Sequence, residues 1–466
     1  MKLKPLALII SSLTISSLTI SSLTISSLTI SSMAFAENPV EAALQVEGAQ
    51  VTLTVKDAQQ SFTPSFVASA RENFNNFHWQ MGGDHSVYYN LHMSEFMPTA
   101  FAAPNEDYKP LVKNLDPRLA KLKVETESKG EMTMAAYLAD EQFRTQGFML
   151  IHKGEIVYEA YPGMSPTDSH VWASTAKTTV GTVVAMLVEE GKVDPEKGIT
   201  HYVPELKGTN WEGITVHQVL NMSTALDNEE TLKSILNPDS DVVRFFAASF
   251  NSPRAKTGEM ETWMNVAKGA QKLDGEKAGD HFRYASINTM VLTKMVENIE
   301  NKTWTQVFED RVWSKVHARQ SMEFNLTPDG MAIAVGLVST TVEDMARWGT
   351  LFTPSWKAVA DEPVISQAVI DRIRNGGDPK AFVGTSKESS SLHAYNEKAD
   401  YNAYQFDFIF NDGAMSKSGN LGQFVYIDPE RDFVGVMFSN NPYHSGFGEN
   451  KGPALMRSAA KLLADK

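Results

Sequence analysis

The 466-residue sequence contains no cysteine. Disulfide bonds, thiol catalysis and cysteine-ligated metal sites are therefore excluded. Basic residues are also in the minority, because 42 lysines and arginines face 56 aspartates and glutamates, which gives a formal net charge of −14. This charge argues against nucleic acid or an anionic membrane as a partner. With 42% hydrophobic and 21% charged residues, the composition is otherwise that of a soluble globular protein.

Signatures of nucleotide and metal binding are also missing from the first part of the chain. Residues 37–130 contain neither a phosphate-binding loop nor a metal-ligand pattern. His78, His85 and His92 are evenly spaced, but seven residues separate each from the next. We interpret them as core or surface histidines rather than as ligands of one metal.

The N-terminus lacks an apolar run long enough to predict a membrane span and instead predicts an export signal. Lys2 and Lys4 form a basic start, Leu6–Ile10 an apolar run, and Ala34–Ala36 a small-x-small cleavage site. Between them, over Ser11–Ile30, SSLTI is repeated four times, a composition too rich in serine and threonine for a confident span. We expect residues 1–36 to be removed, with no stable membrane insertion, and the protein to be periplasmic or secreted.

The mature chain divides into an N-terminal arm, 37–130, packed on a main domain, 131–466. In the arm, 51–55 alternates like a short strand. In the main domain, 147–161 predicts a β-hairpin around Lys153 and Gly154, and 423–439 predicts a second one. Helix-like apolar spacing occurs at 216–222, 242–249, 289–300 and 342–352, and a last helix spans about 452–464, whereas 375–401 is polar and suggests a surface loop or flap.

The stretch that organises the main domain is Val171–Val193. Its apolar residues have the i, i+3, i+4, i+7, i+8 spacing of a helix that buries one face: Val180, Val183, Val184, Leu187 and Val188. Gly191 follows this run and can supply the left-handed residue that closes a helix. The opposite end of the predicted helix carries Ser174 and Lys177.

Ser174 and Lys177 are three residues apart and project from the same helix face. A hydroxyl needs a nearby base to become a nucleophile, and lysine can be that base when burial or a neighbouring cation makes its neutral amine accessible. The helix N-terminus would favour negative charge on the serine oxygen. Alone the pair is a weak signal, since a helix cap and a surface lysine would also explain it. Ser458 and Lys461 match the same pattern on what we interpret as a solvated helix surface.

Tyr284–Ser286, just ahead of a predicted helix, is a second candidate motif. A tyrosine close to Lys177 could pass protons between the nucleophile and the leaving group. The alternative is a core tyrosine before a helix whose N-cap is Ser286 or Asn288. The cap and the chemistry are compatible with each other.

Lys417–Asn420 enters the second predicted hairpin. An edge strand here could place the Asn420 N–H opposite the Ser174 N–H, which would make two donors for an oxyanion. Gly419 would let a substrate approach the backbone closely. Lys256–Gly258 is a more literal Lys-Thr-Gly motif, but it lies in a loop with no predicted strand behind it. Because the chemistry needs a strand beside the serine, we prefer the later match.

In this order, the three motifs resemble those of the serine β-lactamase and penicillin-binding-protein superfamily, which carries Ser-x-x-Lys, then Tyr-x-Asn, then Lys- or His-Thr-Gly. The similarity runs from about residue 147 to the C-terminus. The stretches 173–206, 214–227 and 336–349 resemble its class C-like branch. The Tyr-x-Ser motif followed by asparagine and the upstream segment 77–100 are similar to the 6-aminohexanoate-dimer hydrolase and esterase-like members.

This resemblance implies an α/β fold of the α+β type, β-lactamase/transpeptidase-like, with an antiparallel sheet built from both ends of the domain plus a helical subdomain. Residues 131–466 would then be a serine hydrolase domain that needs no metal or organic cofactor. The resemblance also implies an acyl-enzyme on Ser174, with Lys177 as the base for acylation. Tyr284 would shuttle protons to the leaving group and from the incoming water.

The same resemblance implies the substrate-binding residues. Lys417 would hold positive potential, and the N–H groups of Ser174 and Asn420 would form the oxyanion hole, next to Gly419. Ser286 departs from the family pattern, because β-lactamases use an asparagine there to grip the substrate amide. This departure argues against β-lactams as substrates more strongly than it argues against hydrolase activity in general.

The sequence therefore predicts an exported serine hydrolase of small esters or amides. A β-lactamase or D-Ala-D-Ala peptidase is the alternative enzyme. A non-turnover β-lactam-binding sensor is disfavoured because every motif residue is present. The course of the loops 225–280 and 376–405, which shape the pocket, and the oligomeric state are not predicted from the sequence.

Overall fold

The computed structural model describes residues 50–58, 62–254, 256–441 and 450–464. The predicted signal segment, 1–36, lies outside these residues, so its removal stays a prediction. No helix in the described part of the chain is both long and apolar enough to cross a membrane.

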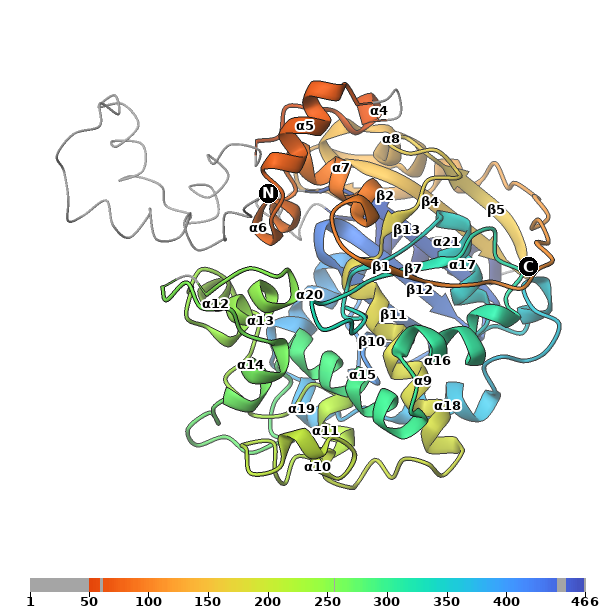
Figure 1. The fold of residues 1–466 in the computed structure, drawn as a ribbon. Helices are drawn as coiled ribbons and strands as arrows, with labels where there is room; N and C mark the ends of the chain where they lie inside the picture. The colour runs from red at the N-terminus through yellow and green to blue at the C-terminus, as the bar shows by residue number, and fades with distance from the viewer. Residues whose placement is uncertain (1–49, 59–61, 255, 442–449, 465–466) are drawn as a thin grey trace, which may run out of the picture.

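A seven-stranded sheet joins the two ends of the main domain (Figure 1). Its order is β5-β4-β13-β12-β11-β10-β9, and every neighbouring pair is antiparallel. Both predicted hairpins are confirmed, and at the first turn Lys153 and Gly154 have φ values of 52° and 77°, as a type I′ turn requires. The strands are β4 Thr145–His152, β5 Glu155–Ala160, β9 Tyr401–Ala403, β10 Phe406–Ile409, β11 Met415–Gly419, β12 Gln423–Asp428 and β13 Phe433–Ser439.

Helices cover both faces of this sheet, which explains why its central strands are apolar runs rather than alternating ones. In β4, Phe148 and Leu150 belong to one hydrophobic cluster with the C-terminal helix α21 (Gly452–Ala464). Met149 and Ile151 point to the other face and share a second cluster with the central helix α9 (Lys177–Glu189) and with α17 (Val342–Thr350). Strands that are buried on both faces carry continuous hydrophobic sequence.

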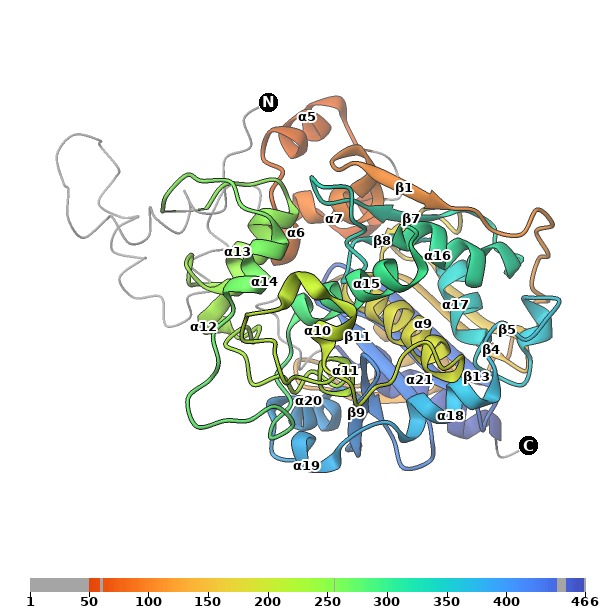
Figure 2. The ribbon, with the colours of Figure 1, turned by 60° about the horizontal axis from the view of Figure 1, so that its bottom comes forward.

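The central helix begins later than its apolar pattern predicted. Strand β6 (His170–Val171) and a 3₁₀ turn, η4 (Ala173–Ala176), precede the α-helix α9 (Lys177–Glu189). Gly191 has the predicted left-handed conformation, with φ 71°. The predicted helices of the middle of the chain also form, within a lobe on one side of α9 (Figure 2). The lobe contains α10 Ile199–Tyr202, α11 Val216–Leu220, α12 Leu232–Ile235, α13 Asp241–Ser249, α14 Trp263–Gly269 and α15 Ser286–Glu300, and α16 Trp304–Arg311 follows outside it.

Smaller sheets and helices complete the described fold. A four-stranded sheet has the order β1-β7-β8-β6, and β2 pairs with β3. The helix α18 packs against α9. The bounds are β1 Thr99–Ala102, β2 Lys123–Thr126, β3 Gly130–Thr133, β7 Met322–Asn325, β8 Val338–Thr340, α8 Met134–Ala139, α18 Gln367–Asn375, α19 Pro379–Phe382 and α20 Ser386–Tyr395.

Two predictions of local structure are wrong. Residues 51–55 do not form a strand, because the carboxylate of Asp84 accepts the Thr52 and Leu53 N–H groups that a neighbouring strand would need. The chain then enters the short helix α4 (Val55–Ala58). The polar segment 375–401 is not a loop but contains α19 and α20. Its serine run is part of a helix that buries Ser391, Ala394 and Tyr395.

The N-terminal arm contributes to the same core as the main domain. Its helices are α5 Pro64–Glu72, α6 Asn76–Met81 and α7 Asp84–His92. Trp79 and Tyr89 belong to the cluster that includes α9.

The three evenly spaced histidines of the arm bond different partners. His78 Nδ1 lies 2.9 Å from a backbone carbonyl oxygen, His85 Nε2 lies 3.2 Å from a serine hydroxyl, and His92 faces a glutamate. Among the described residues, no group of three or more His, Asp or Glu could hold a metal. The boundary at residue 130 stays a prediction.

Candidate active site

Ser174 lies in η4, the turn that joins β6 to α9. The preceding residue, Ala173, has φ 45°, a left-handed conformation that costs an L-residue roughly 1–2 kcal/mol. The buried Trp172 holds the turn in place, because its backbone N–H donates to the Val338 carbonyl (2.7 Å) and its indole N–H donates to Thr340 Oγ1 (2.7 Å). Ser174 is half-buried, whereas the residues on either side of it are buried.

Lys177, the first residue of α9, directs its amine back to this serine. Lys177 Nζ lies 2.9 Å from Ser174 Oγ and 2.7 Å from the Val335 carbonyl oxygen, and the side chain is fully buried. Burial lowers the pKa of Lys177 to about 8, although the carboxylates of Glu230 and Asp407 oppose that shift. About a tenth of the amine is therefore neutral at pH 7, far more than for a lysine with the ordinary pKa, and a lysine base requires this neutral form.

Tyr284 lies between two lysines. Its hydroxyl accepts a hydrogen bond from Lys417 Nζ (3.2 Å), and Lys177 Nζ is 5.2 Å from the centre of its ring. Burial raises the pKa of Tyr284 well above 10, and the charges of Asp407 and Glu230 raise it further, against a hydrogen bond with Ser174 that lowers it. The phenol is therefore protonated at neutral pH and is suited to donating a proton.

Lys417, on β11, forms a buried ion pair with Asp407, on β10. The two side chains are almost completely inaccessible, and Lys417 Nζ lies 2.8 Å from Asp407 Oδ1. Burial lowers the pKa of Lys417 to about 7, with Asp407 opposing this and the other site lysines adding to it. Burial alone would raise the pKa of Asp407, but the ammonium groups of Lys387 and Lys417 outweigh burial and hold it well below its usual range.

Strand β11 brings the third motif beside Ser174, but it is not the edge strand that the sequence suggested. It lies between β12 and β10, and β9 continues the sheet beyond. A Cβ atom on Gly419 would lie 2.8 Å from the Trp172 carbonyl oxygen and 3.0 Å from the Ser174 nitrogen. The close approach that requires a glycine here is thus made by the protein's own backbone. Asn420 follows in the 3₁₀ turn η8 (Asn420–Gly422), and its side-chain amide donates to the Gln80 carbonyl (2.9 Å).

The N-terminus of α15 differs from the predicted cap. The N-cap residue is Ala285, not Ser286 or Asn288, and it offers no side-chain acceptor. Instead the Glu230 carboxylate accepts the Ser286 N–H (2.5 Å), and the Glu230 N–H donates to the Tyr284 carbonyl (2.8 Å). Ser286 is buried within this arrangement. Glu230 therefore holds the backbone at the first and the last residue of the second motif, Tyr284–Ser286.

Three charged residues of this site belong to none of the sequence motifs: Glu230, Lys387 and Asp407. A signal existed for Asp407, because it is the one charged residue of the apolar strand β10, where a buried carboxylate must be paired. Glu230 and Lys387 lie in polar segments, and nothing in their local sequence separates them from surface residues. Only the folded chain brings them to Tyr284.

The structure also separates the two competing motifs from the site. Lys256 is mostly exposed and pairs with Asp239, and no strand lies among residues 256–258. Ser458 is an exposed residue of α21, and Lys461 pairs with Glu397 on the same surface. The preference for Ser174 and for the later lysine motif is consistent with these positions.

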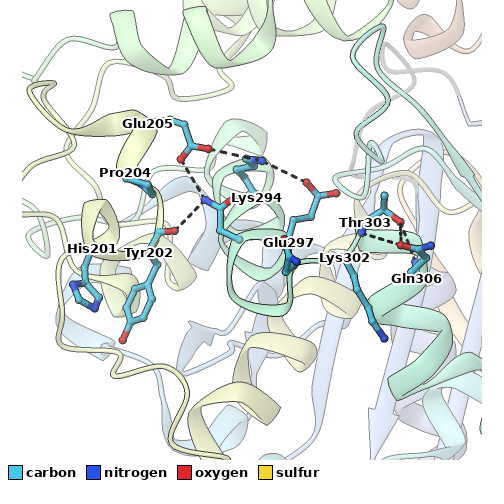
Figure 3. A pocket seen from close by; sticks show the side chains of 11 residues that line it. His201, Tyr202, Pro204, Glu205, Lys294, Glu297, Lys302, Thr303 and Gln306 are labelled. Carbon is cyan, nitrogen blue, oxygen red and sulfur yellow. Dashed lines mark hydrogen bonds and ion pairs between the residues drawn. The ribbon is translucent and has the colours of Figure 1, made fainter.

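A pocket of about 730 Å³ lies elsewhere, between α10, the C-terminal half of α15 and the start of α16 (Figure 3). This pocket is distant from Tyr284, because Tyr284 precedes the N-terminus of α15 and the pocket lies at its C-terminal half. An α-helix rises about 1.5 Å per residue. The charged side chains of the pocket pair with one another, since Lys294 lies 3.8 Å from Glu205 and 3.9 Å from Glu297. Figure 3 shows these side chains turned toward each other across its wall. We assign no role to this pocket in the chemistry.

The sequence profile of the family described as Beta-lactamase matches residues 131–459, which is most of the chain. The chain belongs to this family. A relative from Paenarthrobacter ureafaciens named 6-aminohexanoate-dimer hydrolase is 29% identical over 303 residues, which cover 65% of this chain and 74% of the relative. The family membership and the hydrolases among its relatives make the chain a serine hydrolase.

Solved structures of other proteins share the fold. A Bacillus anthracis protein provisionally named a 6-aminohexanoate-dimer hydrolase superposes with a TM-score of 0.68 at 22% identity, covering 82% of this chain and 95% of that one. EstA from Arthrobacter nitroguajacolicus superposes with a TM-score of 0.51 at 16% identity, covering 76% and 98%. The predicted fold class, a mixed α/β fold with an antiparallel sheet and a helical subdomain, is thus confirmed.

Proposed function

We propose that this protein is an exported serine hydrolase that cleaves small esters or amides through an acyl-enzyme on Ser174. The observation that supports this most directly is the 2.9 Å contact between Ser174 Oγ and the buried amine of Lys177. It joins a nucleophile to a base whose pKa, about 8, lies close to neutral pH. Export rests on the sequence of residues 1–36 alone.

In the acylation step that we propose, neutral Lys177 accepts the proton of Ser174 while Oγ attacks the substrate carbonyl carbon. The carbonyl oxygen becomes an oxyanion, for which the N–H groups of Ser174 and Asn420 are the proposed donors. As the bond to the leaving group breaks, Tyr284 donates its proton to that group. The Lys417 ammonium, which already donates to the Tyr284 hydroxyl at 3.2 Å, can supply the replacement proton.

Deacylation reverses these transfers with water in place of the leaving group. Water attacks the acyl carbon and loses its proton through Tyr284 to the amine of Lys417, which acylation left neutral. Ser174 Oγ leaves with the proton that Lys177 took. Because the pKa of Tyr284 is raised well above 10 by burial, the phenol passes the proton on rather than holding a stable negative charge. Apart from the substrate and water, the proposed steps use only groups of the chain.

Ser286 supports esters and simple amides over β-lactams as substrates. A serine offers one hydroxyl, whereas asparagine offers an acceptor and a donor to a substrate amide side chain. A polar group left unpaired costs about 1–3 kcal/mol, a factor of about 5 to 150 in kcat/KM. The relative from Paenarthrobacter ureafaciens, a 6-aminohexanoate-dimer hydrolase by name, supports a non-β-lactam substrate as well.

A substrate panel on the purified protein tests this proposal. We expect p-nitrophenyl esters of short acids to be turned over at least about tenfold more efficiently, by kcat/KM, than nitrocefin or a D-Ala-D-Ala peptide. Short amide dimers complete the panel. Nitrocefin turnover equal to that of the best ester would favour the β-lactamase alternative instead.

A fluorophosphonate probe tests the nucleophile independently of the substrate. Wild-type protein should be labelled, and Ser174→Ala should not be labelled although it folds normally. Labelling of Ser174→Ala at the wild-type rate would show that another serine reacts, and Ser458 would be the next to test. Cell fractionation of the full-length chain tests export, for which a cytoplasmic pool alone is the contrary result.

A further inference from the structure

Helix α20 places a third lysine in the site. The side chain of Lys387 is only 16% exposed, and its Nζ lies 2.8 Å from Asp407 Oδ2 and 3.2 Å from Ser418 Oγ. The same ammonium is 5.0 Å from the centre of the Tyr284 ring. Lys387 was not singled out from the sequence, because α20 lies in the polar segment that we interpreted as a surface loop or flap.

Lys387 and Lys417 hold the same carboxylate by different oxygens. Asp407 Oδ1 accepts from Lys417 at 2.8 Å, while Oδ2 accepts from Lys387, from the Ser418 N–H at 3.0 Å and from Ser418 Oγ at 2.5 Å. Asp407 is therefore bonded on both sides and cannot rotate without breaking several contacts. A charged side chain that is largely buried in the active site, beside groups with strongly shifted pKa values, is a candidate for a functional role.

We propose that Lys387 is a positioning residue for the reaction: it holds the Asp407 carboxylate in place, and through it directs the Lys417 ammonium at the Tyr284 hydroxyl. This inference rests on the proposed function of the same site. Without Lys387, the Oδ2 side of the carboxylate keeps only Ser418 as a partner. Asp407 could then turn, and Lys417 would lose its alignment with the tyrosine.

The charge of Lys387 also changes the pKa values of the two other site lysines, which an uncharged contact would not do. The charged or titratable groups around Lys177 and Lys417 are Glu230 from the loop before α12, Asp407 from β10, Lys387 from α20 and Tyr284 before α15. Burial lowers the pKa of both lysines most, and the like charge of Lys387 lowers it further. Removing that charge raises both pKa values, so that a higher pH is needed for the same fraction of neutral amine.

The experiment compares wild type with Lys387→Met, which keeps the length of the side chain and removes its charge. The rate of fluorophosphonate labelling and the kcat and KM for the best ester are measured from about pH 5 to pH 10. We expect kcat to fall about tenfold with KM within about twofold, as for a misaligned proton donor. We also expect the acidic limb of the labelling profile to move about 0.5 to 1 pH unit to higher pH.

Two further variants separate charge from packing. Lys387→Arg keeps a cation and should keep the wild-type acidic limb. Lys398→Met is the matched control, because this lysine follows α20, is mostly exposed and pairs with Glu388 outside the site. It should leave both the limb and kcat unchanged. If Lys387→Met does not fold, as judged by circular dichroism, Lys387→Gln carries the same expectations.

An unchanged acidic limb in Lys387→Met, or an equal shift in Lys398→Met, would overturn the proposal. If the wild-type protein is itself neither labelled nor active, it is the proposed function that fails. In that case, NMR titration of the lysine ε-carbons tests Lys387 without turnover. The Lys417 midpoint should rise in Lys387→Met, and an unchanged midpoint would overturn the inference.

Discussion

At the scale of single residues, the chemistry depends on the free-energy cost of burying the charged amine of Lys177. A buried ammonium loses its hydration, and this loss lowers its pKa unless full compensation is provided. Here the compensation is partial, because the nearest acceptors are the neutral Val335 carbonyl and the Ser174 hydroxyl, and the carboxylates act from further away. The same burial that destabilises the cation therefore produces the base.

Lys177 and Tyr284 are the residues whose substitution should stop the reaction. We expect Lys177→Ala and Tyr284→Phe each to lower kcat/KM for the best ester by about two orders of magnitude or more, because each removes a proton-transfer group. Lys417→Ala should also be severely impaired. Lys256→Ala, in the exposed Lys-Thr-Gly motif, should be nearly neutral. A severe loss at Lys256 together with a mild loss at Lys417 would contradict our assignment of the third motif.

At the scale of elements, the position of the nucleophile depends on how closely α9 approaches the sheet. Gly181 lies on the face of α9 that meets the turn between β9 and β10. A Cβ atom there would lie 1.9 Å from the Tyr404 carbonyl oxygen, which is backbone and cannot move aside cheaply. Tyr404 and Gln405 both have positive φ in this turn, and Gln405 is bonded to α15 and α11. The turn is thus fixed from its other side.

We therefore expect Gly181→Ala to destabilise the protein by roughly 1–3 kcal/mol or more, the range for overpacked sites. Because α9 must shift to relieve the clash, ester turnover should fall as well. Urea unfolding measures the stability. Gly269→Ala is the matched control, since Gly269 ends α14 with nothing within 4 Å of its added methyl group. Wild-type stability in Gly181→Ala would show that α9 and the turn are not held in contact in solution.

At the scale of the whole molecule, the N-terminal arm is attached to both halves of the fold. The fully buried Asn440, just after β13, accepts from Ser86 Oγ and Asn90 Nδ2 at 2.9 Å each and donates to the Gly82 carbonyl at 3.1 Å. Trp79 of the arm stacks on Phe250, next to α13 of the helical lobe, with ring centres 6.0 Å apart. The arm therefore joins the sheet to the lobe.

We expect Asn440→Ala to lower the free energy of unfolding by about 2–4 kcal/mol, because it leaves several buried groups of the arm without partners. Asn375→Ala is the control, since the amide of Asn375 bonds only the Asp371 carbonyl within its own helix and is exposed. Thermal or urea denaturation measures both variants. Equal, small effects would show that the arm is held by packing rather than by this asparagine.

Local patterns in the sequence determined much of this protein. The apolar runs of β4, β12 and β13, the turn at Lys153 and Gly154 and the helix α21 were predictable because neighbouring residues suffice to form them. The same holds for Ser174 and Lys177, which lie one helical turn apart. Tyr284 and Lys417 lie far from this pair in the sequence, and their motifs were connected to it by the chemistry that it needs and by the order of the three motifs in a known family.

The tertiary structure alone decided what surrounds these residues. Asp407, Lys387 and Glu230 come from β10, α20 and the loop before α12, and no local spacing relates them to Ser174. Residues 51–55 and 375–401 were misread for the same reason, since a distant carboxylate and a buried helix face override local preference. Burial and charge depend on all the neighbours of a group at once. For this reason the pKa of Lys177, and with it the chemistry, is a property of the folded chain rather than of the motif.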